Sequence, residues 1–192
     1  MGTEKKPLSK IEYDAIRAAA LRKDANSSGK SYETLDGRSI GENEIVILLL
    51  RYTGMHVSIL SKPEEYNLHV KDNMIIWNRT KKEGREAYTS IPVHKDINFN
   101  VQEYIENLKK RKRRISRQYF HALVKELGER AGIQGVSPMS FRHTLAVDLL
   151  EQGYPDAFVM QVLNCSHKSF KSYSKYTDAR KRSMFEKMGW CR

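Results

Sequence analysis

The chain has 192 residues, a length that suits one well-buried domain with at most a short appendage. Apolar residues make up 40% of it, and no apolar run approaches the roughly 20 residues that cross a bilayer, which argues against a membrane protein. A formal net charge of +11 favours a polyanionic partner, either DNA or, as a broader alternative, ribosomal or other RNA. Two cysteines make no disulfide framework, so we expect a reducing intracellular compartment.

The N-terminal part predicts two helices. Residues 1–7 are expected to be a disordered lead-in, and Ser9-x-x-Glu12 is a capping-box pattern that predicts a helix over about 10–22. The segment 24–30 (DANSSGK) is typical of a loop. A second helix is predicted over 42–52, and its six-residue apolar run indicates burial nearly all round.

The middle of the chain predicts a small sheet. After the junction TGMHVSIL (53–60), alternating segments at 68–70, 74–77 and 87–93 read as three antiparallel strands. The second connection, KKEG at 81–84, predicts a basic hairpin tip.

A helix predicted from Val101 runs into six consecutive basic residues. These are either a solvated linker or a surface for sequence-independent phosphate contact, and the sequence favours neither. Ser116 is the expected cap of the next helix, in which we expect Phe120 to be a core residue. The basic run consists of Lys109, Lys110, Arg111, Lys112, Arg113 and Arg114.

The segment 137–178 carries the strongest chemical pattern. Ser137-Pro138 predicts a helix start, and Arg142 and His143 follow close to it, where unpaired N–H groups favour an anion. His167 comes next, and Tyr176 lies nine residues after it. An arginine, a histidine and a tyrosine in this order could together hold and attack a phosphodiester.

Three segments resemble the tyrosine recombinase (phage integrase) family. SFRHTLAVDLLEQG resembles its second arginine box, and HKSFKSYSKYTD resembles its later His-to-Tyr box. The resemblance implies that Arg142 clamps the phosphate, helped by His167 or His143, that His167 is the later histidine, and that Tyr176 is the nucleophile. TGMHVSIL resembles the junction that holds the family's first catalytic arginine, but here the position is His56.

Three assignments depart from the family pattern or stay open. Met139 stands where the family has the first histidine of its second box. The family places a catalytic lysine on the hairpin, which implies Lys82 as general acid, with Lys81 as the near alternative and a DNA contact. Tyr173 lies one turn before Tyr176 and competes with it, although the nine-residue spacing favours Tyr176.

The resemblance implies an α+β, mainly helical fold, in which residues 8–192 form a catalytic domain with a small three-stranded antiparallel sheet. The N-terminal DNA-clamp domain of the family is expected to be absent. The implied activity is that of a site-specific recombinase or integrase that works through a 3′-phosphotyrosyl intermediate, as in a mobile element or viral genome integration. The family chemistry needs neither metal nor ATP.

The implied partner is double-stranded DNA, bound by a homo-oligomer (dimer or tetramer), and the implied location is cytoplasmic, at the nucleoid or host DNA, and not a membrane. The apolar C-terminal tail is expected to dock on a neighbouring protomer. The alternative is a catalytically impaired relative that binds DNA as an architectural or regulatory factor, and His56 and Met139 motivate it.

Overall fold

The computed structural model describes residues 6–25, 30–78, 88–187 and 189. Eight helices and two small antiparallel sheets are found in these ranges. The helices are α1 (Lys10–Ala25), α2 (Glu42–Thr53), α3 (Val57–Ser61), α4 (Val101–Lys109), α5 (Arg117–Arg130), α6 (Pro138–Glu151), α7 (Asp156–Leu163) and α8 (His167–Lys187). The strands are β1 (Ser31–Glu33), β2 (Ser39–Gly41), β3 (His69–Lys71), β4 (Met74–Asn78) and β5 (Tyr88–Pro92).

The core is built around α2, which packs against α1, α6 and β2. All six side chains from Ile45 to Leu50 are at most 1% exposed, which confirms the predicted all-round burial. The neighbouring α1 begins at the predicted capping box, where the Glu12 amide donates to Ser9 Oγ at 3.2 Å and the Ser9 amide donates to Glu12 Oε2 at 2.8 Å. α5 begins at Ser116, whose Oγ accepts from the Tyr119 amide, and Phe120 is fully buried as expected.

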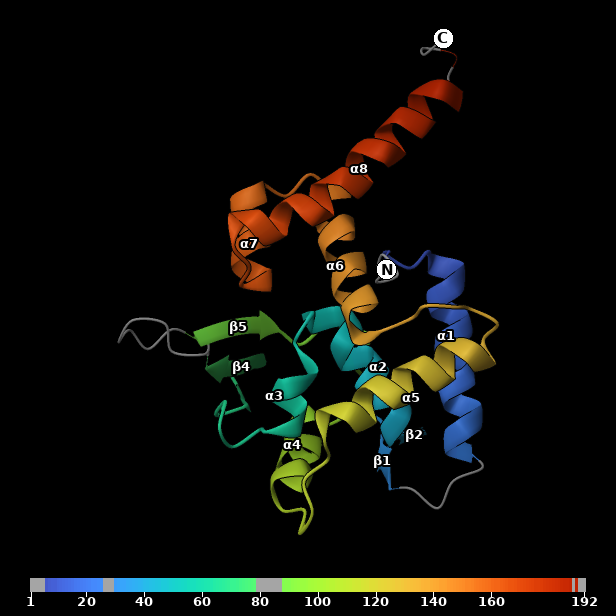
Figure 1. Cartoon of the computed structure of the whole chain (residues 1–192). Helices are drawn as coiled ribbons and strands as arrows, with labels where there is room; N and C mark the ends of the chain where they lie inside the picture. Colours follow the sequence, from blue (N-terminus) through green and yellow to red (C-terminus); the bar gives the residue numbers. More distant parts are fainter. Residues whose placement is uncertain (1–5, 26–29, 79–87, 188, 190–192) are drawn as a thin grey trace.

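The three-stranded sheet has the order β3-β4-β5, and the predicted strands are confirmed to within about two residues. Figure 1 shows this sheet at the side of the helical body, with α7 above it. The predicted hairpin tip at 81–84 lies outside the described residues. None of the helices in the described ranges combines the length and apolar character that a membrane crossing needs.

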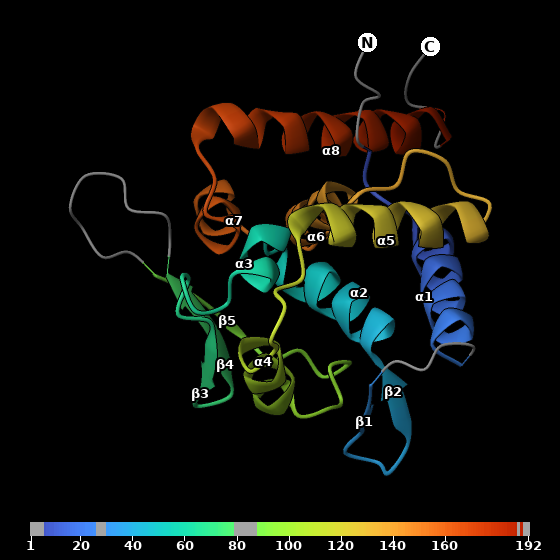
Figure 2. The ribbon, with the colours of Figure 1, turned by 60° about the horizontal axis from the view of Figure 1, so that its bottom comes forward.

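Several elements differ from the sequence predictions. The β1–β2 hairpin, α3 and α7 were not predicted, because each is short and carries little periodicity. α1 continues to Ala25, into the segment predicted as a loop. The tail expected after Tyr176 is part of the helix α8. In Figure 1, α8 crosses the end of α6 and continues away from the body. In the turned view of Figure 2, α8 lies above α5 and α6.

Candidate functional site: a buried arginine between helix ends

Arg142 lies in the second turn of α6 and is only 5% exposed. Its guanidinium donates three hydrogen bonds to neutral oxygens. Nη1 donates to the Gly54 carbonyl at 2.7 Å, Nη2 donates to the Leu163 carbonyl, and Nε donates to the Tyr173 hydroxyl at 3.3 Å. The side chain is therefore fixed by three other segments of the chain.

Both carbonyls that bind Arg142 belong to helix C-termini. Gly54 directly follows α2, and Leu163 is the last residue of α7. The last carbonyls of a helix lack intrahelical partners and lie at the negative end of its dipole, so they favour a cation. Two helix ends thus stabilise the buried charge of Arg142 through backbone oxygens.

Gly54 allows this close approach for two reasons. Its φ of +60° lies in the left-handed region that other residues adopt at a cost. A Cβ at this position would also lie 2.9 Å from Leu163 Cδ2 and 3.0 Å from Leu145 Cδ2. A glycine at the end of α2 therefore brings its carbonyl within reach of Arg142.

Arg142 also lines a small hollow of about 160 Å³. A guanidinium has five N–H donors, and the three bonds above leave two for an oxyanion in this hollow. The other lining residues come from α3, the turn before β3, β4 and the ends of α2 and α7, and include His56, Tyr66, Trp77, Asn78 and Asn164. Arg142 and His56 thus line the same hollow.

His56 occupies the N-cap position of α3, where its side chain makes no capping hydrogen bond, and it reaches solvent beside this hollow. Desolvation by the surrounding atoms, followed by the positive charges of Arg142 and Arg117, lowers the pKa of His56 to about 4. The imidazole is therefore neutral at neutral pH. It can donate one hydrogen bond but adds no positive charge beside Arg142.

His143, Tyr173 and Tyr176 form a cluster of aromatic rings between α6 and α8. The buried His143 ring lies edge-on to Tyr173, with ring centroids 4.7 Å apart, and edge-on to Tyr176 at 6.0 Å. Tyr173 is 3% exposed, whereas Tyr176 is half-buried. Both tyrosines thus lie close to the Arg142–His143 pair, and Tyr176 is the more accessible of the two.

The other predicted site residues are spread more widely. His167 is the exposed first residue of α8, and within the described part of the chain it lies outside the cluster of contacting rings. Met139 is half-buried in the first turn of α6. Lys81 and Lys82 lie outside the described residues, so their position relative to Arg142 stays a prediction.

Arg51, which precedes His56 by five residues, has a separate role. Its Nη2 forms an ion pair with Asp148, and its guanidinium lies over the Tyr13 and Tyr52 rings at 5.5 Å and 5.4 Å. Its side chain does not line the hollow that Arg142 and His56 share. Arg51 therefore does not replace the cation that is missing at His56.

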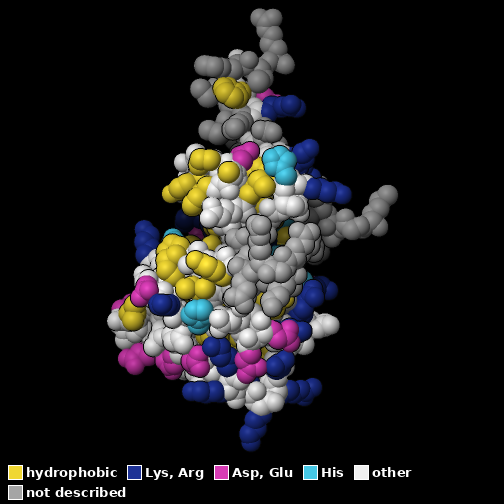
Figure 3. Space-filling model, turned by 90° about the vertical axis from the view of Figure 1, so that its left-hand side faces the viewer, with side chains coloured by type: hydrophobic (Ala, Val, Ile, Leu, Met, Phe, Trp, Pro, Cys, Tyr) yellow, Lys and Arg dark blue, Asp and Glu magenta, His cyan; other side chains and the backbone are white. Residues whose placement is uncertain are grey.

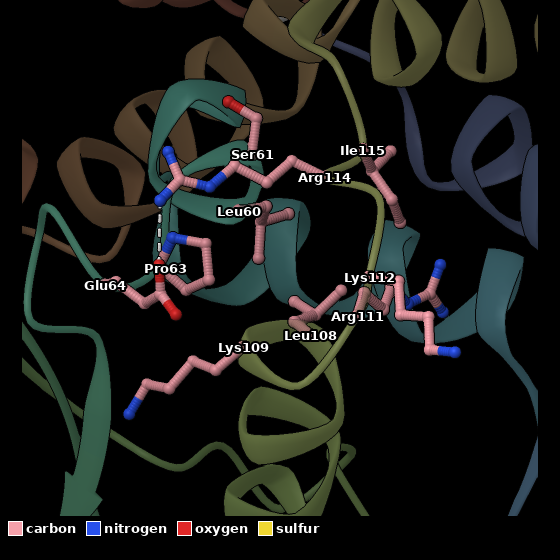
Figure 4. A pocket seen from close by; sticks show the side chains of 10 residues that line it. All are labelled: Leu60, Ser61, Pro63, Glu64, Leu108, Lys109, Arg111, Lys112, Arg114 and Ile115. Atoms are coloured by element: carbon pink, nitrogen blue, oxygen red, sulfur yellow. Dashed lines mark hydrogen bonds and ion pairs between the residues drawn. The ribbon is translucent and has the colours of Figure 1, made fainter.

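The basic run 109–114 divides into two groups. Lys109 pairs with Glu106, Arg111 pairs with Glu42, and Arg114 pairs with Glu64 and Glu65. Figure 4 shows Arg114 reaching Glu64 across a small hollow whose floor includes Leu60 and Leu108. The second group is exposed and forms no ion pair with any described residue: Lys110, Lys112 and Arg113.

A larger groove of about 1020 Å³ lies between β5, α6 and α7. Its lining includes the aromatic residues Tyr88, Tyr154 and Phe158, which are 64%, 44% and 42% exposed. On the face shown in Figure 3, hydrophobic side chains gather in two groups, and Lys and Arg side chains lie mainly toward the margins. On this face the apolar groups are therefore bordered by a mixture of basic and acidic side chains.

Sequence reasoning missed the partners of Arg142. The two carbonyl groups that bind Arg142 belong to the backbone, and no residue type indicates such an acceptor in a sequence. One of them comes from α7, a helix that was not predicted. Tyr173 was considered only as a competing nucleophile or a packing residue. The signal that could have found this role is the spacing of one helical turn between Tyr173 and Tyr176, which puts both on the face of α8 that packs against α6.

Residues 33–183 match the model of the phage integrase family, and the chain belongs to that family. It is 26% identical over 165 residues to tyrosine recombinase XerA of Pyrococcus horikoshii, an alignment that covers 78% of this chain and 56% of that protein. The crystal structure of XerA recombinase superposes with a TM-score of 0.65 at 20% identity, covering 95% of this chain and 64% of that one. A structure of a lambda integrase dimer bound to a core site gives a TM-score of 0.57 at 14% identity, covering 90% and 60%.

These likenesses establish the fold as that of a tyrosine recombinase catalytic domain, mainly helical with a small three-stranded sheet. The chain spans about half to two thirds of the length of these relatives.

Proposed function

We propose that this chain is the catalytic domain of a site-specific DNA recombinase that cuts and rejoins DNA through Tyr176. One observation carries the proposal. The guanidinium of Arg142 is oriented by two helix ends and by Tyr173 of the Tyr176 helix, and it has two further N–H donors beside the hollow that it lines. A preorganised cation of this kind stabilises the charge that develops on a phosphate during displacement.

In this mechanism the Tyr176 hydroxyl attacks phosphorus, a Tyr–O–P bond forms, and the bond to the 5′ oxygen breaks. Arg142 binds non-bridging oxygens, and His143, whose ring contacts that of Tyr176, is the imidazole placed to accept the phenol proton. His167 at the start of α8 adds a phosphate contact, and Lys82 or Lys81 protonates the leaving oxygen. The 3′-phosphotyrosyl bond is later attacked by a 5′ hydroxyl, which rejoins the DNA.

We propose that double-stranded DNA is also held by the exposed members of the basic run. Lys110, Lys112 and Arg113 can contact phosphates without first breaking an ion pair, whereas the other three cations already bind glutamates. This contact is sequence-independent and weakens with salt. We accordingly propose that the protein acts on DNA inside the cell.

We propose further that the protein acts as a dimer or tetramer on DNA. α8 extends beyond the body (Figure 1), and Phe185 near its end is 42% exposed. The groove between β5, α6 and α7 offers apolar surface for the α8 end of a second copy. In sedimentation experiments on DNA, Phe185→Ser should reduce assembly. Unchanged assembly would contradict this docking.

The proposed chemistry is tested by covalent trapping. A duplex is selected by binding from a randomised pool, nicked near its centre, and incubated with the protein. Denaturing gels should show a protein–DNA band, and mass spectrometry of the digested band should place the nucleotide on Tyr176. The band should vanish in Tyr176→Phe. Tight DNA binding without a band would instead indicate a DNA-binding factor that does not cleave.

A further inference from the structure

Tyr173 is the one side chain among the three acceptors that bind Arg142. The other two are backbone carbonyls at the ends of α2 and α7. Tyr173 belongs to α8, one helical turn before Tyr176. A single hydrogen bond, from Arg142 Nε to Tyr173 Oη at 3.3 Å, therefore links the phosphate-binding arginine to the helix that carries the nucleophile.

We propose that Tyr173 is a positioning residue that couples the placement of the Tyr176 helix to the orientation of Arg142. The inference rests on the function proposed above and adds a residue to it. When α8 is docked, the Nε–H of Arg142 has its acceptor and the His143 ring packs against the rings of Tyr173 and Tyr176. When α8 moves away, Arg142 loses its hydrogen bond to Tyr173, and His143 loses its ring contacts with Tyr173 and Tyr176.

The contacts of Tyr173 are suited to this role. Its side chain is 3% exposed, its ring lies 4.7 Å from that of His143, and Phe170 packs against it at 6.3 Å. A buried hydroxyl that accepts from a guanidinium makes a charge-assisted, directional contact. Tyr173 thus fixes the register of α8 over α6 through both its ring and its hydroxyl.

The same contacts separate Tyr173 from Tyr176 as a nucleophile. The Tyr173 oxygen is buried and already accepts from Arg142, whereas Tyr176 is half-buried on the next turn. An attacking oxygen must reach a phosphate that enters from solvent. The geometry assigns positioning to Tyr173 and leaves attack to Tyr176.

The test compares Tyr173→Phe with Tyr32→Phe, a second buried tyrosine, which lies on β1 away from the site. We expect Tyr173→Phe to lower the single-turnover cleavage rate about tenfold, the effect of losing one hydrogen bond to a charged group, while the DNA dissociation constant stays within about twofold. Tyr32→Phe should change neither. An unchanged cleavage rate in Tyr173→Phe, or a fall explained by equally weakened binding, would overturn the proposal.

A second arm does not depend on cleavage. In protein labelled with ¹⁵N-arginine, the Arg142 Nε–H should exchange slowly in the wild type and in Tyr32→Phe, and rapidly in Tyr173→Phe. If no variant forms a covalent complex, the proposed chemistry fails, and this arm alone still decides whether Tyr173 holds Arg142. Equal exchange in all three proteins would overturn the inference. A covalent band that survives in Tyr176→Phe but not in Tyr173→Phe would also overturn it.

Discussion

Arg142 and the run 109–114 are basic side chains in opposite settings. Arg142 is buried and bound by neutral oxygens at two helix ends. The run at the α4–α5 connection lies at the surface, and its bound members are neutralised by glutamates. The first arrangement fixes a direction for the guanidinium and, among the described residues, pairs it with no carboxylate. The second either cancels the charge or leaves it free to move in solvent.

This difference separates two ways of binding a phosphate. A buried, oriented charge acts in a low-dielectric setting and can favour one geometry of one phosphate. Exposed lysines and arginines are screened by salt and bind any phosphate that comes near. We therefore expect substitutions at Arg142 to affect chemistry and folding, and substitutions in the run to affect affinity.

The largest effect is expected for Arg142→Lys. A lysine ammonium is a compact charge that cannot reach both carbonyls and Tyr173, so buried oxygens lose their donors. We expect the free energy of unfolding to fall by about 3 kcal/mol in urea titrations and cleavage to fall by at least about 100-fold. The control Arg130→Lys, at an exposed pair with Glu126, should cost less than about 0.5 kcal/mol. Similar losses in both variants would contradict the buried role of Arg142.

Gly54→Ala should have the next largest effect. Alanine adds both the left-handed strain and the contacts with Leu163 and Leu145, and we expect a loss of about 2 kcal/mol in thermal or urea unfolding. Gly132→Ala is the matched control, because its φ is +74° but a Cβ there would meet nothing within 4 Å. If both variants lose the same stability, the close approach of α2 to α7 is not what Gly54 provides.

The run 109–114 can be tested as two triple variants. Replacing Lys110, Lys112 and Arg113 by Gln should reduce the slope of log affinity against log salt by about 2 to 3, since each phosphate contact contributes about 0.9. The matched triple at Lys109, Arg111 and Arg114 removes the ion pairs and should change this slope less. Fluorescence anisotropy across a salt series measures both. Equal slopes would show that pairing with glutamate does not decide which cations meet DNA.

His56 provides the smallest and most specific test. Its pKa is lowered in the folded protein, so between pH 6.5 and about 4 the unfolded state binds more protons at this residue. Protonation linked to His56 therefore lowers the free energy of unfolding as the pH falls from 6.5 to about 4. Because His56 reaches solvent, the effect should be modest. Below pH 6.5 the melting temperature of the wild type should fall more steeply with decreasing pH than that of His56→Gln. Parallel curves for the two proteins would contradict the lowered pKa.

The sequence predicted most of the regular elements for clear physical reasons. The run Ile45–Leu50 was apolar on every face of a helix, Ser9 and Ser116 had cap spacing, and the strand segments alternated. The short helix α7, which supplies the Leu163 carbonyl, was not predicted because its eight residues show little periodicity. That Arg142, His143 and Tyr176 lie close together could be predicted from the resemblance, whereas the acceptors of Arg142 could not, because backbone oxygens have no sequence signature.

The sequence left the basic run open between a solvated linker and a phosphate-contacting surface, and the structure divides the run into two groups. Its division depends on Glu42 and Glu64, which precede the run by more than 40 residues and meet it only through folding. His56 was recognised as the departure from the family pattern, and its lowered pKa explains why it cannot act as an arginine. Lys81 and Lys82 remain predictions.

The measurement that tests the central claim most directly is the cleavage rate of His56→Arg beside wild type on the same nicked duplex. Arg142 already presents an oriented cation to the hollow, and His56 faces that hollow without charge. A second guanidinium there should raise the single-turnover rate, by up to about 100-fold if it binds the developing charge as an oxyanion donor does. The account predicts this gain, with the product still attached to Tyr176. A rate that is unchanged or lower, in a variant that folds and binds DNA normally, would contradict the claim that Arg142 and His56 share one phosphate site.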